Sequence, residues 1–197
     1  MRFTVFKTKV YISFLFLAFI GVFLLLDKTG LFMPMLFASI IHEVGHLFFM
    51  WILDCQPNEI NLILGSVQIV SSVSNKSFNN ILISFSGPLF NIVVFAILFL
   101  NYVVYKNDEY IVFAFTNLLL GTFNLLALKG LDGGNILFHI IENKYNENVA
   151  EKIVNIITLV IAVLIAVVAL ILSVNGKISI SMYILSIYLI LSVLLKF

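Results

Sequence analysis

Long apolar runs separated by short polar turns dominate this sequence and set the first limit on its fold. Each run approaches the length of about 20 residues that a helix needs to cross a lipid bilayer. Hydrophobic residues make up 62% of the chain and charged residues 11%, whereas a soluble domain has about half and about a quarter. We therefore expect an all-α polytopic membrane protein with about six transmembrane helices. The expected spans are residues 10–26, 31–53, 78–105, 110–128, 153–174 and 178–195.

The distribution of basic residues predicts the orientation of these spans. Cytoplasmic loops of membrane proteins carry an excess of Lys and Arg. With both termini in the cytoplasm, that side carries eight of the 11 basic residues, and the far side carries only Lys28, Lys106 and Lys177. The apolar run at 10–26 is not followed by a small-x-small cleavage site, so we interpret it as a retained first span and not as a signal peptide.

Two connections are longer than the tight turns. Residues 54–77 contain many β-branched and apolar residues around Gly65, which is compatible with a short β-hairpin at the membrane surface or with an irregular loop. Residues 128–152 begin with several glycines and then become polar. The pattern contains no second soluble or regulatory domain, so we expect one membrane domain over residues 1–197.

Three ionisable residues interrupt the second apolar run. His42, Glu43 and His46 lie within the stretch HEVGH, where a single charge costs roughly 2.5–3.5 kcal/mol at the centre of a bilayer. On a helix, residues four positions apart share a face, so both imidazoles can bind one metal ion. H-E-x-x-H is the zinc metalloprotease pattern, with Glu as the general base. The alternative, two histidines that only contact other helices, is less compatible with this apolar setting.

A catalytic zinc site requires a third protein ligand. Asp132 is the best candidate because it follows the fourth apolar run and is flanked by Gly130, Gly133 and Gly134, which permit a sharp bend. The alternative is an ordinary turn at the end of a helix. Asn124 lies in the same run, where its amide would either donate to an oxyanion or join neighbouring helices.

His139 follows Asp132 by seven residues. On a continuing helix the two side chains would lie near the same face. A metal-binding role for His139 is possible, but helix packing or an interface position is favoured.

These segments together resemble the site-2 proteases, which are intramembrane zinc metalloproteases, and most closely the stage IV sporulation type. The resemblance rests on HEVGH at 42–46, SGPLFN at 86–91 and FNLLALKGLDGG at 123–134. The chain departs from the family pattern at Ala127, where relatives usually carry proline. The resemblance implies an α-helical membrane fold, regulated intramembrane proteolysis and a membrane-associated substrate such as a pro-sigma factor.

The resemblance also assigns roles to individual residues. His42, His46 and Asp132 would hold one Zn²⁺ per chain, and Glu43 would be the general base. Asn124 would hold the substrate or the developing oxyanion. The segment with Gly87, Pro88 and Asn91 would be structural or line the substrate cleft.

The main alternative to a protease is a membrane protein that binds or transports zinc. A transporter would normally need several acids or histidines along a path, and here we find one cluster together with Asp132. The expected partners are the lipid bilayer, a membrane-associated protein substrate and regulatory membrane proteins. A net charge of +1 without a basic stripe gives no sign of nucleic-acid binding.

Overall fold

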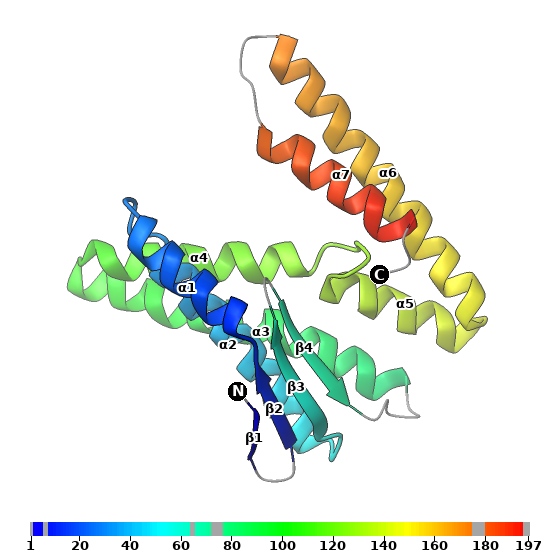
Figure 1. Cartoon of the computed structure of the whole chain (residues 1–197), viewed down its shortest axis with the longest axis horizontal. Coiled ribbons are helices and arrows are strands. Elements are labelled where there is room, and N and C mark those ends of the chain that lie inside the picture. Colours follow the sequence, from blue (N-terminus) through cyan, green and yellow to red (C-terminus); the bar gives the residue numbers. More distant parts are fainter. Residues whose placement is uncertain (1, 6–7, 64–65, 72–76, 175–179, 195–197) are drawn as a thin grey trace. The chain divides into compact units, whose positions relative to one another are not determined.

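The computed structural model describes residues 2–5, 8–63, 66–71, 77–174 and 180–194. The chain divides into two compact units, Met1–Phe123 and Asn124–Phe197. Within the described residues the secondary structure consists of seven helices and four strands, coloured along the chain in Figure 1. The predicted predominance of helices is confirmed, but the strands show that the all-α expectation was incomplete.

The first unit contains helices α1 (Phe14–Leu26), α2 (Phe32–Ile52), α3 (Ser77–Tyr105) and α4 (Asp108–Asn124), which ends at the unit boundary. The boundaries of α2 and α3 lie within one residue of the spans expected from sequence. Helix α2 buries one face, which carries Ala38, His42, Gly45, His46 and Met50. This spacing of three or four residues is that of a single helix face.

The strands form one sheet in the order β1-β2-β3-β4. Strands β1 (Arg2–Val5) and β2 (Thr8–Ile12) pair antiparallel, β2 pairs parallel with β3 (Pro57–Ile63), and β3 pairs antiparallel with β4 (Ser66–Ser71). The β3–β4 pair confirms the hairpin interpretation of the 54–77 stretch. The turn residues 64–65 and residues 72–76 lie outside the described part of the chain.

The expected first span at 10–26 is wrong at its start. Its first residues belong to β2, and α1 begins only at Phe14. The Ser13 hydroxyl accepts a hydrogen bond from the Phe16 N–H at 3.2 Å and so caps the helix. The Ser13 N–H donates to the Leu62 carbonyl of β3 at 2.9 Å, which ends the strand and starts the helix at one residue.

The second unit contains α5 (Asp132–Lys144), α6 (Glu147–Val174) and α7 (Ile180–Leu194). Its core is formed by Leu128, Ala162 and Leu189. The interpretation of residues 128–152 as a polar connection was wrong for its central part, because α5 forms there. The Asn146 side chain accepts the Val149 N–H at 2.9 Å and starts α6 directly after α5, so polar residues here form helix ends and caps.

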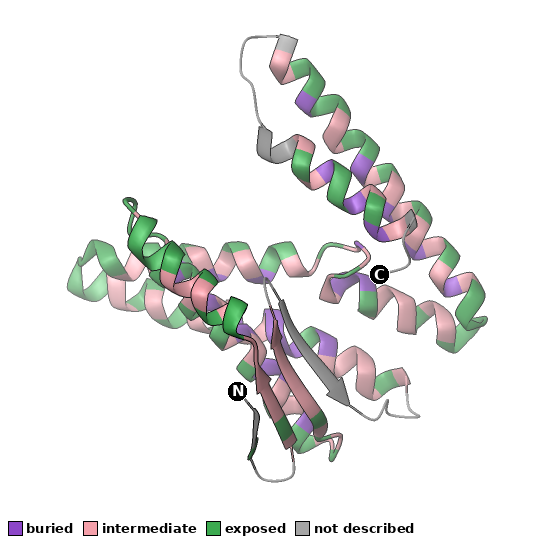
Figure 2. Ribbon diagram, viewed as in Figure 1, coloured by how far each residue is buried: buried purple, intermediate pink, exposed green. Residues whose placement is uncertain are grey.

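Three described helices are long and apolar enough to cross a bilayer: Phe32–Ile52, Ser77–Tyr105 and Glu147–Ser173. Shorter apolar helices cover Phe14–Leu26 and Tyr183–Val193. Figure 2 shows many exposed residues along these helices, and they include large apolar side chains such as Phe14 and Leu25, 82% and 87% exposed. Such surfaces suit a multi-pass membrane protein, while the expected count of six spans is not confirmed.

Candidate metal centre

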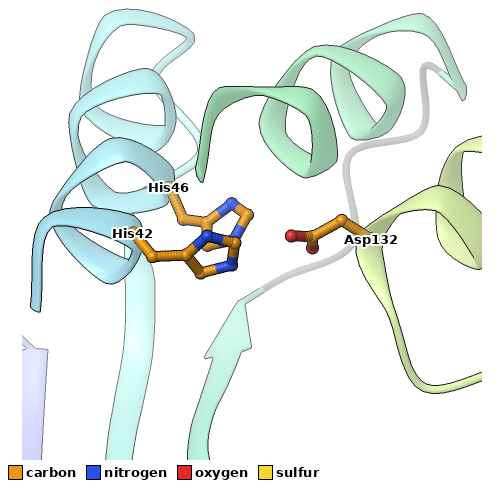
Figure 3. Close-up of side chains that lie close together, drawn as sticks. All are labelled: His42, His46 and Asp132. Atoms are coloured by element: carbon orange, nitrogen blue, oxygen red, sulfur yellow. The ribbon is translucent and has the colours of Figure 1, made fainter. Parts of the chain in front are cut away.

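A pair of buried histidines lies on the inner face of α2. His42 is 7% exposed and His46 is 8% exposed. Their rings are nearly perpendicular, and their Nε2 atoms are 3.2 Å apart. Figure 3 shows the two imidazoles projecting from successive turns of the same helix. The spacing of four residues therefore places both rings at one point, as the sequence predicted.

Hydrogen bonds to the other ring nitrogens determine the tautomer of each histidine. His46 Nδ1 lies 2.8 Å from the carbonyl oxygen of Ile83, which can only accept, so Nδ1 carries the proton. His42 Nδ1 lies 2.8 Å from Asn91 Oδ1, which also accepts. In the neutral rings both Nε2 atoms are then unprotonated, and they lie 3.2 Å apart.

This arrangement fits a zinc ion. Two unprotonated nitrogens 3.2 Å apart repel each other, and a cation bound to both removes that repulsion. Tetrahedral Zn²⁺ binds histidine nitrogen at about 2.0–2.1 Å, which separates two ligand nitrogens by about 3.3 Å. The donors are neutral imidazoles oriented by hydrogen bonds at Nδ1, as is usual for zinc-binding histidines. The donor chemistry and the spacing therefore agree with one shared ion.

Two glycines allow α3 to approach this pair closely. A Cβ atom on Gly45 of α2 would lie 2.7 Å from the Ser86 carbonyl oxygen and 3.0 Å from Gly87 Cα. A Cβ atom on Gly87 of α3 would overlap the His46 ring and approach His42 Cε1 to 2.9 Å. These contacts are too close for a Cβ atom at either position. Glycine is therefore required at Gly45 and Gly87 if the two helices are to keep this spacing.

Asn91 of α3 connects three helices at the histidine pair. It is completely buried and accepts from His42, as described above. Its Nδ2 donates to the Ala38 carbonyl of α2 at 2.9 Å and to Asn117 Oδ1 of α4 at 2.9 Å. Asn117 in turn donates to the Phe113 carbonyl at 2.8 Å. The sequence pointed to Asn91 as part of a family motif, but its contact with His42 was not foreseen.

The remaining site residue of α2 is Glu43, directly after His42. Its side chain is half-buried, in contrast to the two histidines. Asn124, the predicted oxyanion donor, is the last residue of α4 and is also half-buried. Pro88 lies inside α3 and is fully buried. The predicted roles of Gly87, Pro88 and Asn91 in substrate binding remain predictions.

In the second unit, Asp132 is the first residue of α5. A carboxylate is favoured at that position because the helix dipole is positive at its N-terminus. Cβ atoms on Gly133 and Gly134 would overlap backbone atoms of Leu125 and Leu128. The two glycines thus allow the chain before α5 to fold back onto the start of the helix, which confirms the predicted sharp bend.

His139 lies two turns further along α5. Its Nδ1 is 3.0 Å from Glu142 Oε2, one turn away on the same helix. This contact lies within one helix, so the expected role of His139 in helix packing or at an interface stays a prediction.

Comparison with known proteins adds independent information. Residues 107–168 match the family model described as Peptidase family M50. No curated protein sequence matches the chain. Among solved structures, the site-2 protease from Methanocaldococcus jannaschii has a similar fold, with a TM-score of 0.69 and 22% sequence identity over 98% of this chain and 93% of that one. At that identity the likeness concerns the fold.

Residues 107–168 are thus similar to a segment of peptidase family M50. This segment contains Asn124 and Asp132, whereas the HEVGH helix lies outside it. The family match and the histidine pair therefore come from different parts of the chain. Together they support a zinc metalloprotease.

Proposed function

We propose that this chain is an intramembrane zinc endopeptidase that cleaves membrane-associated proteins. The observation that carries this proposal is the pair of Nε2 atoms at 3.2 Å on α2. Helix α2 is itself one of the helices long and apolar enough to cross a bilayer. A zinc-binding pair on such a helix brings hydrolytic chemistry to a depth where soluble proteases do not act.

We propose Asp132 as the third zinc ligand. A catalytic zinc site has three protein ligands of the His, Cys, Asp or Glu type, and α2 supplies two. Figure 3 labels the three proposed ligand side chains, each of which offers one nitrogen or oxygen atom. Support comes from the position of Asp132 in the M50 segment and at a glycine-rich helix start.

Zinc supplies Lewis acidity, which lowers the pKa of water to about 7 at such sites. The Glu43 carboxylate would accept the proton of the attacking water and pass it to the leaving amine. The Asn124 amide would donate a hydrogen bond to the oxyanion that forms at the scissile carbonyl. His42 and His46 would keep their Nδ1 protons throughout, because Asn91 Oδ1 and the Ile83 carbonyl hold them.

A helical substrate must unwind before its peptide bond can be attacked, because its carbonyls are hydrogen-bonded. The sheet of the first unit provides strand edges at which an extended segment can add as a further strand. The segment with Gly87, Pro88 and Asn91 would border the cleft, and both chain termini would lie in the cytoplasm. The assignments to the sporulation type, regulated intramembrane proteolysis and a pro-sigma factor substrate rest on the sequence resemblance.

The proposal is tested by reconstituting the purified protein in liposomes with solubilised membrane proteins and identifying new N-termini by mass spectrometry. Wild type should generate N-termini within apolar segments. Glu43→Gln should generate none while it retains zinc, and Glu109→Gln, on the exposed first turn of α4, should behave like wild type. The same new N-termini with Glu43→Gln would refute the proposal.

A further inference from the structure

A cavity of about 270 Å³ lies entirely within the second unit. It is bordered by the loop before α5, by α5 and by the first turns of α6. The polar residues that line it are Lys129, Asn135, His139, Glu151 and Asn155. None of these residues has a role in the proposed hydrolysis.

The α6 wall of this cavity presents hydrogen-bond acceptors. Glu151 and Asn155 are four residues apart and therefore share one face of the helix. Asn155 Oδ1 is buried, and no described residue donates a hydrogen bond to it. A buried acceptor without a donor costs roughly 1–3 kcal/mol. A rotation of the Asn155 amide would turn this acceptor toward the cavity, which Asn155 lines, and a ligand N–H group would then stabilise it.

The loop wall presents a donor. The Lys129 N–H donates to the Thr158 hydroxyl at 2.9 Å, and Thr158 Oγ1 donates to the Val154 carbonyl at 2.8 Å. These bonds hold the loop against α6. Lys129 also lines the cavity, and its ammonium group is a hydrogen-bond donor. Gly130, with φ +87°, turns the chain at this point. The His139 Nδ1 on α5 is engaged with Glu142.

We propose that this cavity binds a primary carboxamide side chain, that of glutamine or asparagine, from the peptide substrate. The NH₂ group of a carboxamide can donate to Asn155 Oδ1 and Glu151, and its oxygen can accept from Lys129. Lys129 would repel a lysine side chain. Glu151 would repel a carboxylate, which would also leave Asn155 Oδ1 without a donor. A leucine could form no hydrogen bond with either the donor or the acceptors. The assignment to the substrate, unlike the binding itself, rests on the proposed function.

The distance along the chain places this cavity close to the proposed cleavage site. Gly130 and Gly134 line the cavity, and each is two residues from Asp132. Consecutive Cα atoms are about 3.8 Å apart, so each glycine Cα lies within about 7.6 Å of that of Asp132. An extended peptide advances about 3.3 Å per residue. We therefore expect the recognised side chain two or three residues from the scissile bond.

Saturation-transfer NMR on the full chain in detergent micelles tests the binding directly. The probes are N-acetyl methylamides of glutamine, asparagine, leucine, glutamate and lysine, with empty micelles as the blank. The glutamine and asparagine probes should bind best. Asn155→Leu should weaken their binding about tenfold, the equivalent of one hydrogen bond. Asn148→Leu, an exposed position on the same helix, should bind as wild type does.

A second variant keeps the test decisive if Asn155→Leu fails to fold. Asn155→Asp retains the shape of the side chain but adds a negative charge, so it should shift the preference from the glutamine probe toward the lysine probe. Equal binding of the leucine and glutamine probes to wild type, or an unchanged preference in Asn155→Asp, would overturn the inference. Stronger binding of free glutamine than of capped glutamine would refute the assignment to a peptide substrate.

The same measurement on Glu43→Gln separates this inference from the proposed function, because it requires no turnover. If the glutamine probe binds but no proteolysis is ever detected, the proposed function fails and the binding site stands. If membrane proteins are cleaved, glutamine or asparagine should be enriched two or three residues from the new N-termini, and Asn155→Leu should remove the enrichment. Cleavage without that enrichment would overturn the inference and leave the proposed function intact.

Discussion

Asn91 Oδ1 lies 2.8 Å from His42 Nδ1, although the two residues are 49 positions apart and lie on different helices. The same amide donates to Asn117 on a third helix. The contact holds the proton of His42 on Nδ1, so the unprotonated Nε2 can act as a metal ligand. The packing of α2, α3 and α4 is thereby coupled to the protonation of a proposed zinc ligand.

Asn91→Ala should therefore weaken zinc binding without removing either histidine. Loss of the partner that orients a metal-binding histidine typically costs 10- to 100-fold in affinity, and we expect a loss in that range. Competition with a chelating dye measures it. Asn101→Ala is the control, since Asn101 lies on the same helix and its side chain donates to the Ile97 carbonyl one turn away. Equal affinities of the two variants would contradict the coupling.

Gly87→Ala should abolish zinc binding while the helices remain folded. The added Cβ would overlap the His46 ring, so the imidazole would rotate away and the 3.2 Å spacing would be lost. Gly21→Ala, where a Cβ would have nothing within 4 Å, should retain zinc. Circular dichroism and metal analysis on both variants check this expectation, and a zinc-loaded Gly87→Ala protein would show that the rings are not confined by α3.

Gly134→Ala and Gly130→Ala should both lower thermal stability, the first more strongly. A Cβ on Gly134 would overlap the Leu128 carbonyl, whereas one on Gly130 would enter open space. Overpacking costs about 1–3 kcal/mol and can exceed this, while a left-handed backbone costs an alanine about 1–2 kcal/mol. Melting in detergent compares the two variants. The reverse order would mean that the chain before α5 does not pack as described.

The turn between α1 and α2 should loosen at acidic pH. Hydrogen bonds from the Thr29 hydroxyl and then from the Phe32 N–H lower the pKa of Asp27, with further bonds from the N–H groups of Thr29 and Gly30. The carboxylate therefore stabilises the turn fully above its unfolded pKa of about 3.9, and this stabilisation is lost as pH falls through the lower folded pKa.

Hydrogen exchange of the amides at residues 29–32 measures that change. Their protection should fall in wild type only at a pH below about 4. In Asp27→Asn the protection should be weaker and independent of pH over this range. Protection in wild type that falls near neutral pH would contradict the assignment to Asp27.

The metal-binding pair was predictable because its physics is local. Two histidines four residues apart on a helix lie on the same face, so their rings come together, as they do in the structure. Glu43 and Asp132 became site candidates through the motif and through the glycines that surround the acid, and their roles stay predictions. Asn91 was visible only as a motif position, because its contact with His42 joins two helices and leaves no local pattern in the sequence.

The sheet and α5 were harder to predict for a different reason. Residues 10–12 are apolar and continue directly into α1, so hydropathy alone cannot separate β2 from the helix. Pairing of Lys9 with Glu59 in parallel strands is non-local, and its 3.7 Å ion pair has no sequence signal. The sequence of α5 resembled that of a polar loop, because the buried residues of this helix are Gly133 and Gly134 and not large apolar side chains.

The zinc content of the purified protein tests the central claim most directly. It should be measured in wild type, His46→Ala, Asp132→Ala and the exposed control Asp108→Ala, all purified without chelators. We predict about one zinc per chain in wild type and the control, and a loss or marked weakening in the other two. A zinc-free wild type, or full zinc retention in Asp132→Ala, would contradict a shared site of His42, His46 and Asp132.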